Sequence, residues 1–108
     1  MHITESEMKE FKKGDLVNWH SAANNVFWCI VINKVYPNQY RLISSGGSIL
    51  NIDEERIENT NIKDVVENNR KAWGCLPSRT INEIKQIYAG LGIVCPEEII
   101  NLEKEIEK

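Results

Sequence analysis

The hydrophobic periodicity of the chain changes near residue 59, and this change limits the folds that the chain can adopt. Before residue 59, short runs of β-branched and aromatic residues are separated by glycine, asparagine and proline turns. After it, apolar residues recur at the three- and four-residue spacing of amphipathic helices. A run of strands followed by a run of helices predicts an α+β fold.

Five strands are predicted in the first half of the chain. The strongest signal is VFWCIVINKVY at residues 26–36, which is apolar on both faces for most of its length. Gly46 and Gly47 close a later hairpin, where glycine supplies the positive φ of the turn. The other predicted strands lie at residues 16–20, 39–44, 48–52 and 56–58.

Three helices are predicted after residue 60. Asn61 can cap the first helix, with Asp64 at the third helical position, and Gly74 ends it. Thr80 and Glu83 have the spacing of a capping box, so the second helix is expected to begin at Thr80.

The third helix is expected to begin at Pro96, where the missing N–H of proline is no loss. Val94 and Ile99 have the spacing of a hydrophobic staple across this helix start. The last two helices also carry apolar stripes, so we expect the helices to pack on the strands as one cooperative unit. The stripes consist of Ile81, Ile84, Ile87, Ile99, Leu102 and Ile106.

A group of short motifs lies between residues 13 and 58. The segment opens with KGDLV at 13–17, continues through the long strand and YRL at 40–42, and closes with IDEERI at 52–57. This pattern resembles the SH3-like and Tudor-like small β-barrels. The resemblance implies a five-stranded barrel that binds peptides, modified side chains or nucleic acid, often through aromatic residues near the loop between the first two strands. It implies a binding module rather than an enzyme.

The predicted elements divide the chain into three parts. These are an N-terminal segment at 1–12, an SH3-like barrel at 13–59, and a helical appendage at 60–108 that packs on the barrel. The predicted fold is therefore α+β, with a five-stranded SH3-like small β-barrel followed by about three C-terminal helices.

The sequence offers few residues for catalysis. His20 and Cys29 could form a thiol–imidazole pair, but Cys29 lies in an apolar run that predicts a buried, inert thiol. Gly46 and Gly47 lack the lysine and helix that follow in a phosphate-binding loop, and the three cysteines contain no CxxC pair. We therefore expect no enzymatic activity, no cofactor and no bound metal.

Aromatic residues are the candidates for contact with a partner, because they remove large areas from water at low entropic cost. Trp19 and Phe27 flank the polar loop at 21–25, and a second aromatic pair flanks the turn at 37–38. Burial of Trp19 and Phe27 in the core is the alternative interpretation. The predicted partner-binding residues are Trp19, Phe27, Trp28, Tyr36 and Tyr40.

Adjacent strand residues point to opposite faces, so Phe27 and Trp28 cannot face the same core. We expect the helices to cover one of these faces, with Trp73 as an anchor. A partner protein is the alternative cover.

The charge balance makes nucleic acid the second choice of partner. The formal net charge is −3, whereas chains that bind nucleic acid usually carry a basic surplus. A helix-turn-helix is disfavoured because Glu97 and Glu98, at the start of the last helix, would repel phosphates. The residues of the alternative, a nucleic-acid-binding barrel surface, are Lys34, Arg41 and Arg56.

The sequence therefore predicts a non-catalytic protein–protein interaction module. Its bias towards Ile, Asn and Lys indicates an A/T-rich genome, and we expect an accessory or counter-defence (inhibitor) protein of a phage or mobile element in a low-GC bacterium. The chain lacks the apolar run of about 18 residues that spans a membrane and the pattern of a secretory signal. We expect a cytoplasmic protein with no membrane partner.

Overall fold

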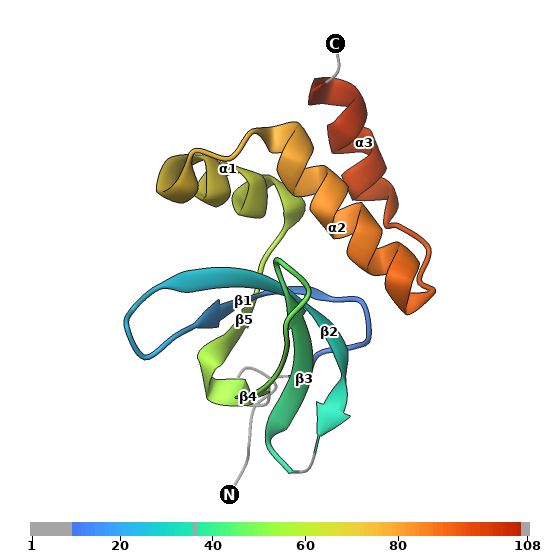
Figure 1. Cartoon of the computed structure of the whole chain (residues 1–108). Helices are drawn as coiled ribbons and strands as arrows, with labels where there is room; N and C mark the ends of the chain where they lie inside the picture. The colour runs from blue at the N-terminus through green and yellow to red at the C-terminus, as the bar shows by residue number, and fades with distance from the viewer. Residues whose placement is uncertain (1–9, 36, 107–108) are drawn as a thin grey trace, which may run out of the picture.

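Five antiparallel strands precede three helices in the computed structural model, which describes residues 10–35 and 37–106 (Figure 1). The fold is therefore α+β, as predicted. One sheet contains all five strands in the order β4-β3-β2-β1-β5. A short 3₁₀ turn, η2 (Glu54–Arg56), connects its two edge strands. The strands are β1 (Leu16–His20), β2 (Val26–Val35), β3 (Gln39–Ser44), β4 (Ile49–Asp53) and β5 (Ile57–Asn59).

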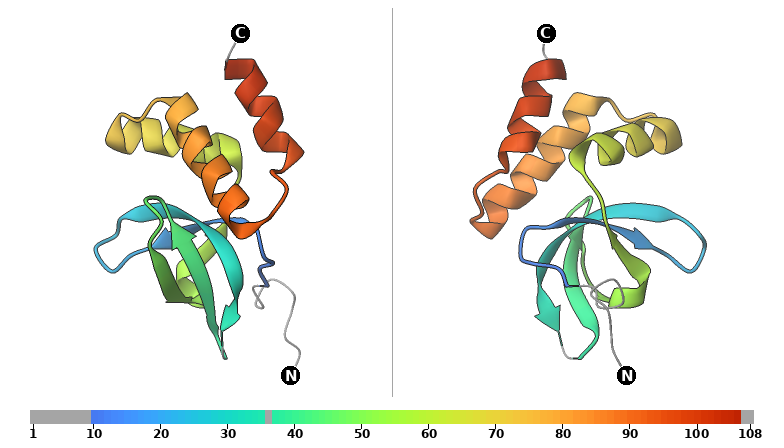
Figure 2. Two further views of the ribbon diagram at one scale, coloured as in Figure 1. Left: turned by 45° about the vertical axis from the view of Figure 1, so that its right-hand side comes forward. Right: turned by 180° about the vertical axis from the view of Figure 1, so that it is seen from behind.

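The sheet is strongly curved, and its strands wrap around an inner core (Figure 2). The register of β2 against β3 shifts between Val31 and Asn33, which marks a bulge at Ile32. A bulge increases the local twist and bend of a strand, so it favours this curvature. The strand β1 pairs with β2 on one side and with β5 on the other.

The helices all lie on one side of the sheet (Figures 1 and 2). They are α1 (Ile62–Trp73), α2 (Pro77–Leu91) and α3 (Glu97–Ile106). The ammonium of Lys85 in α2 lies 3.0 Å from both carboxylate oxygens of Glu103 and so connects α2 to α3. Among the described residues, no helix is long and apolar enough to cross a membrane.

The predicted ends of α1 are confirmed. The Asn61 side chain accepts a 2.9 Å hydrogen bond from the backbone N–H of Asp64, as an N-cap does. Gly74 ends the helix with a φ of +68°, a conformation that costs glycine little.

The predicted start of α2 is wrong. The helix begins at Pro77, which lies in the first turn after the N-cap residue Leu76. Proline suits this position because the first helical N–H groups have no partner within the helix. Thr80 is instead buried inside the helix, within 3.3 Å of the Asn69 amide nitrogen that donates to its hydroxyl.

The predicted staple before α3 is also wrong. The Val94 side chain is 89% exposed and so does not pack on the first turn of the helix. The preceding residue, Ile93, packs against the core together with Cys95. The helix begins at Glu97, one residue later than predicted, and the carbonyl of Pro96 before it accepts from the N–H groups of Ile99 and Ile100.

Alternation along β2 divides the core into two clusters. Trp28 and Ile30 face the helices, whereas Cys29 and Val31 face the interior of the curved sheet. This explains why the strand is apolar on both faces, and the expectation that the helices cover one face is confirmed. The helix-facing cluster contains Trp28, Ile30, Ile62, Val65, Val66, Ile81, Ile84, Tyr88 and Ile99. The sheet-interior cluster contains Phe11, Val17, Cys29, Val31, Tyr40, Leu42 and Ile57.

Candidate binding site

Trp73, the last residue of α1, is a large apolar side chain on the surface. Its side chain is 59% exposed, so it is not the buried anchor that the sequence predicts. The Trp73 ring is nearly parallel to the Phe27 ring of β2, with 6.4 Å between ring centroids and 13° between planes. The stack joins the end of α1 to the edge of the β1–β2 hairpin.

Phe27 also contacts Trp19 of β1, which extends the contact to three aromatic rings. The two rings have centroids 5.3 Å apart. Trp19 lies directly opposite Phe27 in the register of β1 and β2, so both side chains point to the same face. We call Trp19, Phe27 and Trp73 the aromatic row.

A cleft of about 400 Å³ lies beside this row, between the sheet and the first two helices. We call it the Trp73 cleft. A cavity of this size is within the range that holds a large side chain or a small ligand. Its walls come from β2, the β3–β4 turn, α1, the segment after α1, and α2: Phe27, Trp28, Ser45, Gly46, Asn69, Trp73, Cys75 and Glu83.

Two polar side chains of the Trp73 cleft, Asn69 and Glu83, present hydrogen-bond acceptors. The amide nitrogen of Asn69 donates to the Thr80 hydroxyl at 3.3 Å, which leaves the Asn69 oxygen as an acceptor. The Glu83 carboxylate lies 3.6 Å from Nε of Arg79, one helical turn earlier, and the Arg79 side chain is 72% exposed. Ion pairs this exposed contribute little, so Glu83 keeps most of its capacity to bind another cation.

Trp28 forms the floor of the cleft and is only 4% exposed. Its indole nitrogen is buried without a hydrogen-bond partner, and the same holds for Trp19. A buried N–H without a partner costs free energy. Because both atoms are covered, neither donates to a ligand at the surface without a rearrangement.

A second, more polar cavity of about 520 Å³ lies next to Trp73, between the β1–β2 hairpin and α1. Nε2 of His20 and Oε1 of Glu58 meet there at 2.7 Å and connect β1 to β5. Trp73 and Asn69 line both cavities, so the indole stands between them.

The five predicted partner-binding residues have different surroundings. Trp19 and Phe27 are half-buried and belong to the aromatic row. Trp28 is buried beneath the helices, and Tyr36 lies outside the described residues. Only part of the predicted set therefore lies together at the surface.

The prediction that Tyr40 binds a partner is not supported by its position, because Tyr40 is buried. Tyr40 is 1% exposed, and its hydroxyl accepts a 3.3 Å hydrogen bond from the backbone N–H of Phe11. The Phe11 ring also packs edge-on against the Tyr40 ring. The physical reason is that the sheet curves around Tyr40, which satisfies the hydroxyl inside the core.

Trp73 is the surface residue that the sequence analysis did not predict as part of a site. Its spacing from Val66 places it on the apolar stripe of α1, so local pattern favours burial. The end of α1, however, extends beyond the sheet centre and lies over the β1–β2 hairpin (Figure 1). The Gly74 cap directly after Trp73 was the available signal, because it marks Trp73 as the helix terminus.

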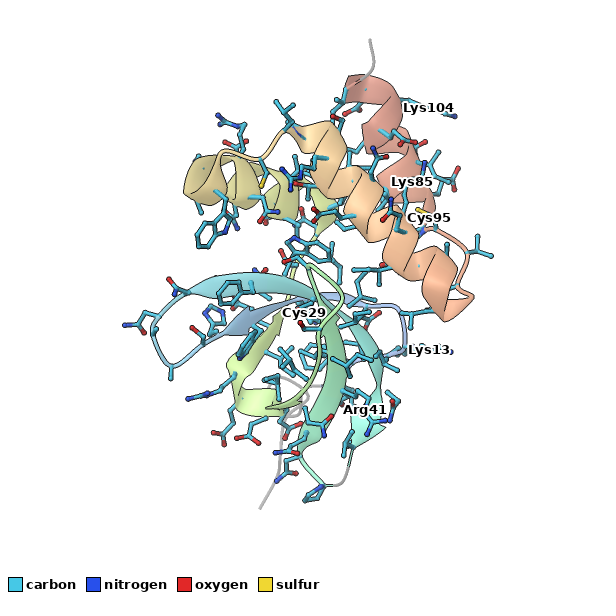
Figure 3. All side chains as sticks on the ribbon, in the orientation of Figure 1. Lys13, Cys29, Arg41, Lys85, Cys95 and Lys104 are labelled. Atoms are coloured by element: carbon cyan, nitrogen blue, oxygen red, sulfur yellow. The ribbon has the colours of Figure 1, made fainter. Side chains whose placement is uncertain are left out.

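Two residues of the nucleic-acid alternative, Lys34 and Arg41, point to opposite faces of the sheet. Lys34 lies opposite Tyr40 in the register of β2 and β3, and its ammonium is 5.9 Å from the Tyr40 ring centroid. Arg41 follows Tyr40 and so points to the opposite face, where its Nε donates to Asn51 at 3.3 Å. Arg41 lies far from the helices (Figure 3), and Arg56 lies in η2.

The expected burial of the Cys29 thiol is confirmed. Cys29 lies in the sheet interior, and burial raises its pKa to about 12. The candidate partner His20 is exposed and contacts Glu58 instead. Within residues 10–35 and 37–106, no three His, Cys, Asp or Glu side chains are grouped to hold a metal ion.

Comparison with protein-family models, with curated proteins and with solved structures gave no match to this chain.

Proposed function

We propose that this protein is a non-catalytic protein-interaction module, and that the aromatic row and the Trp73 cleft form its partner site. The proposal includes an SH3-like barrel as the finer description of the curved sheet. The observation that carries it is the exposed indole of Trp73, stacked on Phe27 beside a cleft of about 400 Å³.

Tryptophan is enriched among the residues that dominate binding energy, and such residues lie next to pockets that exclude water. Trp73 is an exposed tryptophan that lines two cavities, so a partner can reach it and cover it. The buried Cys29 thiol and the exposed His20 are separate, which supports a function without nucleophilic catalysis. The residue bias described above supports a phage or mobile-element protein as the biological setting.

The test is affinity capture from an extract of a low-GC bacterium, followed by mass spectrometry. Three baits are compared: the wild type, Trp73→Ala, and Val94→Ala as a matched variant at another exposed apolar residue. The captured protein is then purified, and its affinity for each bait is measured by calorimetry. We expect Trp73→Ala to weaken binding by at least about 2 kcal/mol, as for a residue at the centre of an interface.

Val94→Ala should bind as the wild type does. Equal affinity of all three baits would place the partner site elsewhere and overturn the proposal. Capture of nucleic acid instead of protein would also overturn the proposal. Nucleic acid is detected because it raises the ratio of ultraviolet absorbance at its own maximum to that at the protein maximum.

A further inference from the structure

We propose that the Trp73 cleft binds an arginine side chain of the partner protein, with the guanidinium lying against Trp73 and pairing with Glu83. The inference rests on the proposed function and names the chemistry that its site recognises. Charge, hydrogen-bonding capacity and shape of the cleft each favour this occupant.

The charge of the cleft is negative. Glu83 is the one ionised side chain among the described residues that line it. Its contact with Arg79 is 3.6 Å long and involves a guanidinium that is 72% exposed, so a better-placed cation can replace it. A phosphate group would instead meet a carboxylate without a lining cation, which disfavours nucleic acid at this position.

Two side chains of the cleft, Asn69 and Glu83, offer acceptor oxygen atoms that a donor can bind. A carboxylate such as Glu83 only accepts hydrogen bonds, and the Asn69 oxygen is also an acceptor, while one of the two amide N–H groups of Asn69 donates to Thr80. The indole N–H of Trp28 is covered and does not compete as a donor. A guanidinium carries five N–H donors and no acceptor, so it matches this set of oxygen atoms.

The shape of the cleft favours a flat cation over a round one. Trp73 and Phe27 both line the cleft, and their rings are nearly parallel, with 13° between planes, so the cleft offers flat aromatic surface. A guanidinium is planar and stacks on aromatic faces, whereas a lysine ammonium is compact and strongly hydrated. Arginine can therefore contact Trp73 with its plane while its edge donates to Glu83.

The test uses three capped amino acids as probes: N-acetyl-arginine methylamide, its lysine counterpart, and its citrulline counterpart. Citrulline keeps the planar end group but is uncharged. Binding of each probe is followed by NMR titration of the ¹⁵N-labelled full chain, through the Trp73 indole N–H and the backbone N–H groups of α1 and α2. Circular dichroism confirms that each variant is folded.

We expect the arginine probe to shift the Trp73 indole resonance and to bind at least about tenfold more tightly than the citrulline probe, as a charge-assisted hydrogen bond implies. Glu83→Gln should remove that preference, whereas Glu97→Gln, at an exposed carboxylate in α3, should retain it. The lysine probe should bind more weakly than arginine.

Equal binding of arginine and citrulline in the wild type would overturn the inference without any variant. An arginine preference that survives Glu83→Gln would overturn it as well. Failure of the proposed function gives a different result. In that case the captured partner binds the wild type and Trp73→Ala equally well.

Discussion

The hydroxyl of Tyr88 donates a 2.7 Å hydrogen bond to the backbone carbonyl of Gly14, 74 residues earlier in the chain. Tyr88 lies in α2 and is 1% exposed, whereas Gly14 lies in the turn before β1. Gly14 has a φ of +92°, and a Cβ there would lie 3.4 Å from the Ile93 side chain. The positive φ therefore favours glycine where the helices meet the sheet, and the space beside Gly14 is filled to ordinary contact distance.

Tyr88→Phe removes this bond while keeping the ring. We expect it to lower the free energy of unfolding by about 1 kcal/mol, because the half-buried carbonyl of Gly14 loses a partner. Urea unfolding followed by circular dichroism measures the change. A loss too small to resolve would show that the bond makes no net contribution.

The stability difference between the wild type and Tyr88→Phe should depend on pH. Burial, followed by the negative charges at Cys95, Glu98 and Asp15, raises the pKa of Tyr88 from 10.0 to about 12. Between these values the unfolded chain loses the phenolic proton while the folded protein keeps it, so stability falls as the pH rises. The stability difference between wild type and Tyr88→Phe should therefore shrink from pH 10 to pH 12. A constant difference would contradict the raised pKa.

Ile84 tests whether sheet and helices unfold together. Its side chain is fully buried between α2 and the rest of the helix-facing cluster. Ile84→Ala should lower the free energy of unfolding by about 2–5 kcal/mol and leave one transition. Calorimetry that resolves two transitions would contradict a cooperative unit.

Trp19 and Trp73 should respond differently to truncation. Trp19 packs against the sheet-interior cluster, so Trp19→Ala should cost about 2–4 kcal/mol of stability, whereas exposed Trp73→Ala should cost less than about 1 kcal/mol. Trp19→Phe should cost less than Trp19→Ala, since it also removes an indole N–H without a partner. Thermal unfolding of the three variants ranks them directly, and equal losses at Trp19 and Trp73 would contradict their different burial.

Cys29 should be unreactive in the folded protein. Its pKa of about 12 leaves almost no thiolate at neutral pH, and its sulfur is covered by the sheet. Alkylation at pH 7, mapped by mass spectrometry, should label Cys29 only after denaturation. Fast labelling of Cys29 in the native state would contradict the burial seen here.

Most elements of the fold could be predicted from local sequence. The alternation in 39–44, the Asn61 cap and the Gly74 terminus act over a few residues, and the structure has them where they were expected. Local signals failed where two of them competed. A first-turn proline at Pro77 overrode the capping-box spacing of Thr80 and Glu83, because Pro77 is compatible with an earlier helix start.

The candidate site was decided by tertiary structure. The β1–β2 register places Trp19 beside Phe27, and the path of α1 over this hairpin places Trp73 on Phe27 and leaves it exposed. Tyr40, equally aromatic in sequence, is buried because the curved sheet closes around it and Phe11 bonds its hydroxyl. Periodicity and caps depend on contacts within one helix or strand. The exposure of a side chain depends on which elements pack together. That packing is set by contacts between residues far apart in the chain, which local sequence patterns do not contain.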